Sequence, residues 1–359
     1  MANSYLTNAK KAKNDEFYTQ YSDIEKEIAA YIEYDPDVFK DKTILLPCDD
    51  PEWSNFTKYF AQNFERFGLK KLISTSYAAD SKKYDSGYQP TLFEKDDPKF
   101  DKNKTKKNGK IFTLTRDKTG DGKVDVEDLE WSYLKGDGDF RSDEIKKLRN
   151  EADIIITNPP FSLFREFLSW VVESKKKFLI IGNMNAIIYK EVFPLIKDDK
   201  VWLGNNYKVN GGAMFYEIPE DIANPDQVRE VRTNKAGKKV YITRVQGVRW
   251  FTNLDHGRLH EKLPLMTEAD VIKFSTKKPF DKYDNYDAID VPLIKDIPSD
   301  YEGVMGVPVS FMDKYNPEQF EIVGSNRGVD QDPKGIYGHG SYIDGKETYK
   351  RIFIKHKKK

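Results

Sequence analysis

Short apolar runs alternate with amphipathic segments along the first half of the chain. Apolar residues recur at helical spacing over 23–32, which predicts a helix. The apolar run 43–46 predicts a buried strand, and an amphipathic helix is expected over 52–67, ending at Gly68. A second buried strand is expected at 71–76. This order of strand, helix and strand is typical of a doubly wound α/β fold with a parallel sheet.

Residues 80–135 interrupt this alternation, because they are charged and rich in turn-forming residues apart from the apolar run 110–115. We interpret them as an insertion, with a hairpin that lies over the ligand site. The alternation then resumes with helices and strands at 142–150, 152–157, 163–174, 178–183 and 201–203.

The sheet is expected to end in an antiparallel hairpin formed by 214–218 and 239–251. Beyond residue 253 the helical alternation ceases, and Pro, Gly, Tyr and Asp dominate between short strands. We therefore expect a first domain over 1–253, which includes the insertion 80–135, and a smaller, mixed and loop-rich lobe over 254–359.

The composition is that of a globular protein, but by itself it does not indicate that the protein binds nucleic acid. The 59 basic residues are balanced by 59 acidic ones, so any binding to nucleic acid must come from a local basic patch. The clearest candidate is the tail 349–359, where basic residues alternate with aromatic and apolar ones, as on a strand with one solvent-exposed face. A solvated terminal strand without a ligand is the alternative.

Cys48 is the only cysteine, so an internal disulfide is impossible and a reducing compartment is expected. The sequence has no apolar run of the roughly 18 residues that a membrane span needs, and its polar start is unlike a secretory signal. We therefore expect a cytoplasmic protein without a membrane partner.

The most informative segment is Asn158-Pro159-Pro160-Phe161, directly after the apolar run 152–157. A buried parallel strand that stops at such a turn opens onto a ligand crevice at its carboxyl end. Neither proline carries an N–H, so the turn is stiff and offers acceptors without donors. An amine bonded to the Asn158 amide oxygen and the Pro159 carbonyl would have its lone pair aimed at an electrophile without any base.

Phe161 offers a flat face on which a base withdrawn from a duplex can stack, which is worth roughly 1–3 kcal/mol. The simpler alternative is an ordinary strand-to-helix turn with a proline near the first helical position.

Two other strand ends carry candidate ligand-binding acids. Asp49-Asp50 stands where doubly wound folds hold a nucleotide-like ligand, although the Gly-x-Gly fingerprint is missing; a helix cap is the alternative. Asp139-Phe140 follows a glycine-rich stretch, and it pairs an acid that could accept from an amino group with an aromatic ring that could pack against a ligand. A glycine-rich turn is its alternative.

No metal ligand is assigned to the site. Residues 117–128 resemble a calcium loop, but Thr119 and Asp128 depart from its pattern, so a calcium site and a polar hairpin turn both remain open. His256 and His260 lack the glutamate of a metalloprotease motif, and we expect them to serve polar packing or DNA contacts. Cys48 has no flanking basic residue to activate it as a nucleophile.

Taken in order, six segments resemble the EcoRI-type adenine-specific DNA methyltransferase family over nearly the whole chain. These segments are 14–20, 48–51 with 54–56, 136–142, 157–166, 247–257 and 283–288.

The resemblance implies a Rossmann-like sheet that binds S-adenosylmethionine, with the motif order of the gamma-type amino methyltransferases. It assigns catalysis to Asn158, Pro159, Pro160 and Phe161. It assigns cofactor binding to Phe17, Tyr18, Thr19, Asp49, Asp50, Pro51, Asn55, Asp139 and Phe140. Within these, Phe17 to Thr19 would contact the methionine end of the cofactor, and Asp139 would accept from its adenine amino group.

The implied activity is sequence-specific methylation of adenine N6 in double-stranded DNA with base flipping, in restriction-modification or phage DNA protection. A cognate restriction endonuclease acting separately is a possible partner, and 254–359 would be the target-recognition region that reads the bases. The alternatives are another planar amine, such as cytosine N4, RNA adenine or a protein glutamine, and a catalytically silent DNA-binding homologue.

Overall fold

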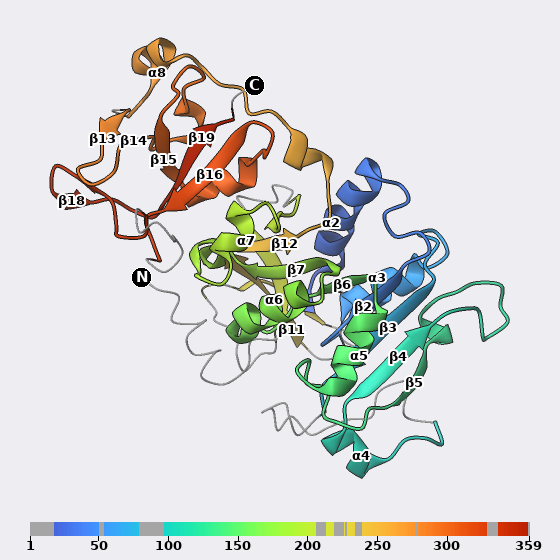
Figure 1. Cartoon of the computed structure of the whole chain (residues 1–359). Helices are drawn as coiled ribbons and strands as arrows, with labels where there is room; N and C mark the ends of the chain where they lie inside the picture. The colour runs from blue at the N-terminus through green and yellow to red at the C-terminus, as the bar shows by residue number, and fades with distance from the viewer. Residues whose placement is uncertain are drawn as a thin grey trace. The chain divides into compact units, whose positions relative to one another are not determined.

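The computed structural model describes residues 18–49, 54–78, 97–205, 213–218, 226, 228–233, 239–277, 279–328 and 337–357. Figure 1 draws the whole chain, coloured by residue number. Contacts within the chain divide it into two units. Unit 1 consists of Met1–Asn183 and Asn206–Leu254, and unit 2 of Met184–Asn205 and Asp255–Lys359. The segment 184–205 thus joins the second unit, and the roles predicted for 1–253 and 254–359 stay predictions. No helix in the described ranges is long and apolar enough to cross a membrane.

Unit 1 is a mixed α/β structure built on a large sheet. Its strands lie in the order β5 (Glu130–Tyr133), β4 (Lys110–Leu114), β3 (Lys71–Ser76), β2 (Thr43–Leu46), β6 (Ile154–Thr157), β7 (Lys177–Asn183) and β12 (Val248–Thr252). The four strands β3, β2, β6 and β7 are parallel, and the outer strands are antiparallel to their neighbours. β2 and β6 are buried at every residue, because parallel strands covered on both faces need no polar side. The predicted strands 43–46 and 71–76 are confirmed.

The described residues of unit 1 form the helices α2 (Tyr21–Tyr34), α3 (Asn55–Gln62), the short α4 (Lys102–Lys107), α5 (Asp143–Glu151) and α6 (Phe164–Glu173). Ser54 and Ser142 cap α3 and α5 by accepting a backbone N–H. The predicted end of the second helix was wrong: α3 ends at Gln62, and turns lead on to Gly68, whose φ of +61° lies in the left-handed region. Residues 52–53 lie outside the described ranges.

The hairpin expected within 80–135 is present as β4 and β5. It pairs with β3 through Leu72↔Leu114 and therefore extends the large sheet at its edge, rather than lying over the site. The sequence could not show this, because the same alternating pattern of β4 serves an edge strand and a covering hairpin equally well.

A second, smaller sheet has the order β1 (Tyr18–Thr19), β9 (Ala213–Ile218), β11 (Lys239–Gln246) and β10 (Val228–Thr233). The predicted antiparallel pairing of 214–218 with 239–251 is confirmed for β9 and β11. The predicted second strand is divided at Gly247, whose φ is +74°, and its latter part leaves as β12 to pair antiparallel with β7. β10 was not predicted.

Unit 2 contains a five-stranded sheet in the order β13 (Asp281–Lys282), β14 (Ala288–Asp290), β15 (Val304–Pro308), β19 (Arg351–His356) and β16 (Phe320–Ser325). The described residues of unit 2 also form two short α-helices, α7 (Phe193–Lys197) and α8 (Glu268–Phe274), and the short strands β8 (Trp202–Leu203), β17 (Tyr342–Ile343) and β18 (Lys346–Glu347). Short strands were expected here, but α8 was missed because its seven residues show little periodicity.

The basic tail does not form a strand with one solvent-exposed face, so this prediction was wrong. β19 lies between β15 and β16, and Ile352, Phe353 and Ile354 have no exposed surface. Arg351 is bonded to Asp290, with Nε 2.7 Å from Oδ1 and Nη2 3.3 Å from Oδ2. The alternation of basic and apolar residues therefore reflects a central strand whose first basic residue has a buried partner.

Candidate active site

The carboxyl ends of β2, β3 and β6 meet at one edge of the large sheet. The parallel register pairs Leu46 with Ser74 and Leu45 with Ile155. The turn after β2 therefore lies between the end of β3 and the Asn158 turn that follows β6. The sequence analysis placed candidate residues at the ends of two separate strands, and the structure brings the Asp49 and Asn158 segments together.

Asp49 is held in the interior of this edge, with 5% of its surface exposed. Ser54 Oγ donates to its Oδ1 at 2.6 Å. The Thr157 hydroxyl lies 2.6 Å from Asp49 Oδ2 and 2.6 Å from the Pro47 carbonyl. The Asp49 carboxylate thus joins the start of α3 to the residue directly before Asn158.

The backbone of this turn has the shape that a glycine usually provides. Cys48 has a φ of +72°, in the left-handed region that few non-glycine residues adopt. The Asp49 carbonyl accepts from Thr57 Oγ1 at 3.1 Å and from Ser74 Oγ. These hydrogen bonds offset the backbone strain. The turn therefore keeps its left-handed conformation at Cys48, although the Gly-x-Gly fingerprint is absent.

The Asn158 turn is stiff and partly open. Pro159 and Pro160 are buried, whereas Asn158 and Phe161 are half-buried. The Pro160 carbonyl accepts from Leu163 N at 2.9 Å and so begins the 3₁₀ turn that leads into α6. The edge of one ring meets the face of the other between Phe161 and Tyr216 of β9, with centroids 6.5 Å apart and planes at 88°. The small sheet therefore supports the ring of Phe161.

Asp139 lies in a turn that packs closely on the end of β3. A Cβ at Gly138, where φ is +90°, would come within 2.3 Å of the Ser76 carbonyl oxygen. The Asp139 carboxylate accepts from the Arg141 guanidinium at 2.8 and 2.5 Å, and these bonds lower its pKa. The Phe140 ring has no exposed surface and packs against α6, so it anchors this turn. Its predicted contact with a ligand ring stays a prediction.

Tyr77 belongs to this site, and sequence reasoning missed it. Its hydroxyl interacts with the Cys48 side chain and the Phe140 backbone, close to Asp139. Burial first, and then the nearby Cys48 and Asp139, raise the pKa of Tyr77, so it stays a neutral donor. The available signal was its position directly after the buried strand 71–76.

Thr19 and Asn55, two of the predicted cofactor-binding residues, lie together. Asn55 Nδ2 donates to the Thr19 carbonyl at 2.7 Å. Thr19 is 3% exposed, and its hydroxyl has no hydrogen-bond partner among the described residues. A buried hydroxyl in this state fits a ligand that supplies the missing partner. Phe17, Asp50 and Pro51 lie outside the described residues, as does the side chain of Tyr18.

The loop 117–128 uses its acids as acceptors for backbone N–H groups. Asp117 accepts from Gly120 N at 2.6 Å and Gly122 N at 2.9 Å. Asp128 is buried, which alone would raise its pKa, but three backbone donors lower the pKa to about 2. The described residues hold no group of three or more His, Cys, Asp or Glu side chains suited to a metal ion. This geometry favours the polar hairpin turn.

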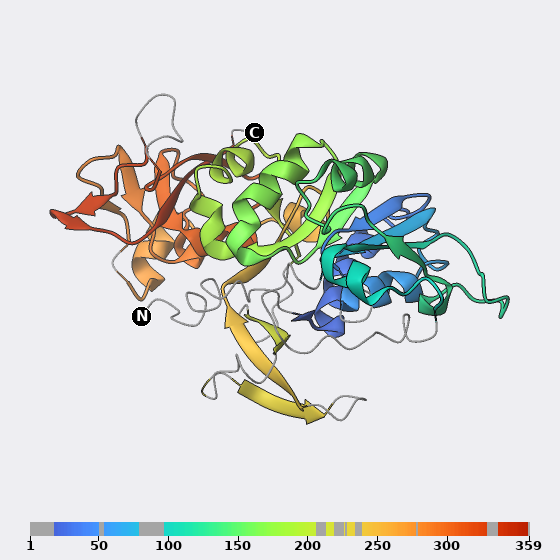
Figure 2. The same cartoon turned by 90° about the horizontal axis from the view of Figure 1, so that it is seen from below.

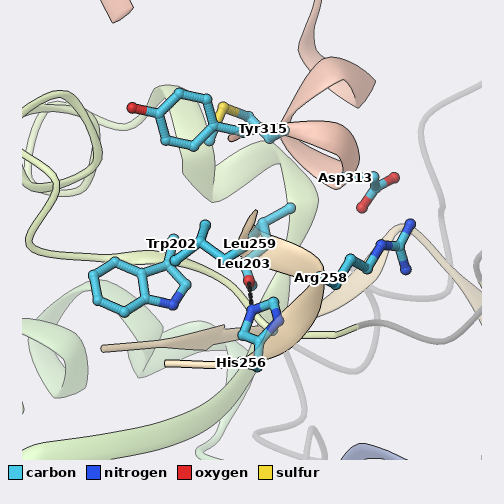
Figure 3. Close-up of a pocket in the computed structure, with 9 residues that line it drawn as sticks. Trp202, Leu203, His256, Arg258, Leu259, Asp313 and Tyr315 are labelled. Atoms are coloured by element: carbon cyan, nitrogen blue, oxygen red, sulfur yellow. Dashed lines mark hydrogen bonds between the residues drawn. The ribbon is translucent and has the colours of Figure 1, made fainter. Parts of the chain in front are cut away.

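His256 and His260 have polar partners within unit 2. Figure 3 shows the His256 ring directed at the Leu203 carbonyl, 3.0 Å from Nε2, in a small pocket also lined by Trp202 and Tyr315. Burial lowers the pKa of His256. His260 lies 2.7 Å from both Asp255 and Glu318. Polar packing, one of the two expected roles, describes both side chains.

Comparisons with known proteins agree with this geometry. The family model described as adenine-specific methyltransferase EcoRI matches residues 5–357. The Type II methyltransferase M.EcoRI of Escherichia coli is 43% identical over 356 residues, which cover 99% of this chain and 97% of that protein. The Type II methyltransferases M.MgeORF184P of Mycoplasma genitalium and M.MpnI of Mycoplasma pneumoniae are 34% and 33% identical, with 98% of each chain covered. No solved structure matches the chain.

Proposed function

Because this chain belongs to the family of the adenine-specific methyltransferase EcoRI, we propose that it transfers a methyl group from S-adenosylmethionine to adenine N6 in double-stranded DNA. The observation that carries the proposal is the position of the stiff, donor-poor turn Asn158–Phe161 beside the Asp49 turn, at the carboxyl edge of the parallel strands. Ligands of doubly wound sheets bind at this edge.

The chemistry follows from what this turn can and cannot do. The Asn158 amide oxygen and the Pro159 carbonyl accept the two amino hydrogens, which directs the nitrogen lone pair out of the ring plane. Bound S-adenosylmethionine supplies an electrophilic methyl group. In the transfer, the amino nitrogen would form the new N–C bond as the C–S bond of the donor breaks, and the amine would then release a proton to solvent. Positioning therefore supplies most of the rate.

Phe161 provides the surface on which the flipped adenine stacks. Phe161 is half-buried, and Tyr216, which has no exposed surface, contacts its ring at 88° between the ring planes. Stacking worth roughly 1–3 kcal/mol offsets part of the cost of withdrawing the base from the duplex.

The residues present fit S-adenosylmethionine. The Thr19 hydroxyl, which lacks a partner among the described residues, would bind the methionine end, together with Phe17 and Tyr18. Asp139 would accept from the adenine amino group, with Phe140 behind it and the neutral Tyr77 beside it. Asp50, Pro51 and Asn55 would complete the cofactor side of a Rossmann-like sheet, and 254–359 would read the DNA sequence. The E. coli and Mycoplasma relatives are Type II enzymes, so a separate cognate endonuclease belongs to the proposal.

The direct test is product analysis. Purified enzyme is incubated with methyl-labelled S-adenosylmethionine and unmethylated genomic DNA, and the digested nucleosides are separated by liquid chromatography and mass spectrometry. We expect N6-methyladenine. Label in N4-methylcytosine, or in RNA or a protein glutamine offered in place of DNA, would identify a different substrate. Absence of transfer to any of these acceptors would indicate a catalytically silent homologue.

Asp139→Ala is expected to weaken S-adenosylmethionine binding roughly 10- to 100-fold, because a hydrogen bond to a charged group is worth about 1.5–3 kcal/mol. Calorimetric titration measures this affinity. Asp143→Ala is the matched control, because its side chain is 96% exposed at the start of α5. An Asp139→Ala variant with wild-type affinity would reject the cofactor role.

Asp49→Asn and Thr157→Val are both expected to lower kcat roughly 100-fold with little change in cofactor affinity. Asp49→Asn removes the negative charge, and Thr157→Val removes the hydroxyl, from the Asp49–Thr157 contact that positions Asn158, and a displacement of about 1 Å has an effect of this size. Single-turnover rates and calorimetric affinities separate the two quantities, and Thr157→Ser, which keeps the hydroxyl, should restore the rate. If Asp49→Asn weakens cofactor binding while Thr157→Val changes nothing, Asp49 contacts the cofactor directly.

A further inference from the structure

The antiparallel strands β10 and β11 form a ribbon that the described site does not use. In Figure 2 these two strands, drawn in yellow, extend away from the large sheet of unit 1. β10 is the edge strand of the small sheet, and every residue from Arg229 to Thr233 is exposed, including Val231 at 50%. A strand exposed on both faces contributes little to a core, so its side chains serve another purpose.

The ribbon is a one-sidedly basic segment beside the site. Residues 228–244 contain six basic residues and one acid, Glu230, in a chain whose net charge is zero. Among the side chains that the structure describes, Arg229, Arg232 and Lys239 are exposed. Such clustering of one sign of charge matches a polyanion.

The base of this ribbon lies next to the catalytic turn. Val228 pairs with Thr243, and Thr243 pairs with Tyr216, which contacts Phe161. Two strand spacings place Val228 roughly 10 Å from Tyr216. The Arg229 guanidinium lies over the ring of Phe215, 5.9 Å from its centroid. From there, the six residues of β10 reach roughly 20 Å outward, the length of about six base pairs.

We propose that this basic ribbon binds the phosphate backbone of the duplex that flanks the flipped adenine. The inference rests on the proposed function, because it takes DNA as the substrate. Its position follows from charge and geometry: a ribbon that starts at the base-stacking ring and carries cations outward can hold the flanking duplex while the base is withdrawn. A two-stranded ribbon also has the dimensions that a DNA groove admits. Contacts to phosphates fix the register and orientation of the DNA.

The experiment measures binding and not methyl transfer, so the ribbon and the proposed chemistry are tested apart. The full chain is titrated into a fluorescein-labelled, mixed-sequence duplex of 30 base pairs at salt concentrations from 50 to 200 mM. We compare the wild type with the triple variant Arg229→Gln, Arg232→Gln and Lys239→Gln. Losing two to three phosphate contacts lowers the slope of log affinity against log salt by roughly 2 to 3. Over this fourfold range of salt concentration, the wild type should then lose roughly 15- to 60-fold more affinity than the variant.

Three controls separate DNA binding from structure. Lys26→Gln with Lys40→Gln removes exposed cations elsewhere in unit 1 and should leave the slope unchanged. Replacing Arg229 and Arg232 by lysine keeps the charges and should keep the wild-type slope. Glu230→Gln should tighten binding, because Glu230 is bonded to Arg232 at 2.7 and 2.9 Å and draws its charge away from DNA. A structural role for these residues predicts no tightening.

An unchanged slope in the triple variant, with normal S-adenosylmethionine affinity and thermal stability, would overturn the proposal. The charges would then protect the exposed edge of β10 from pairing with another chain. In that case the triple variant should associate at high concentration, which sedimentation velocity detects.

Discussion

Asn158→Ala is expected to lower the rate of methyl transfer at least about 100-fold and to leave the affinity for S-adenosylmethionine near that of the wild type. The alanine removes the side-chain acceptor that holds one amino hydrogen, so the nucleophile loses its orientation. The rest of the turn should persist, because Pro159 and Pro160 are buried and the Pro160 carbonyl keeps its bond to Leu163. Single-turnover transfer to DNA and calorimetric titration measure the two quantities.

Two further variants make this result specific. Asn158→Asp retains an acceptor and should keep more activity than Asn158→Ala, whereas Asn150→Ala, at the exposed end of α5, should behave like the wild type. An Asn158→Ala enzyme that methylates DNA at close to the wild-type rate would remove this residue from the mechanism. Loss of cofactor affinity in the same variant would instead show that the turn binds the donor.

Arg351→Met is expected to lower the free energy of unfolding of unit 2 by about 3–5 kcal/mol, because it leaves the buried Asp290 carboxylate without its cation. Only 12% of the Arg351 side chain and 11% of the Asp290 side chain are exposed. Tyr283 donates its hydroxyl to the same carboxylate at 2.5 Å, so the pair belongs to a buried network. Urea unfolding of the variant and the wild type gives the difference.

The control for this prediction is Arg327→Met. Arg327 pairs with Glu347 at the surface, where 34% and 46% of the two side chains are exposed, so its loss should cost less than about 1 kcal/mol. Adding Asp290→Asn to Arg351→Met removes the stranded charge and should recover part of the stability. Equal, small losses in the Arg351 and Arg327 variants would mean that Arg351 is solvated and free to contact a ligand.

Part of the site could be read from the sequence because it depends on local pattern. The run 152–157 predicts a buried strand, and two prolines after Asn158 predict a turn without donors, whatever the rest of the chain does. The resemblance assigned Asn158 and Asp139 to one enzyme site, and in the structure their turns lie at the ends of β6 and β3, which both pair with β2. The family could also be identified from the sequence, since the matched motifs span the chain.

Other parts of the site depend on partners distant in the chain. Asp49 reads as a ligand-binding acid, yet its carboxylate meets Thr157, 108 residues later, and Ser54. Tyr77 carries no motif, and only the approach of Cys48 and Phe140 makes it part of the site. Neither contact leaves a signal in any short window of sequence.

The sequence by itself determined which runs are buried strands, where the donor-poor turn stands and to which family the chain belongs, because these follow from short-range patterns. Only the tertiary structure decided that Asp49 faces inward, that the basic tail becomes the central strand β19, and that β10 forms an exposed ribbon. The physical reason is that strand pairing and side-chain partners are chosen between distant segments, and one alternating pattern satisfies an edge strand and a central strand equally well.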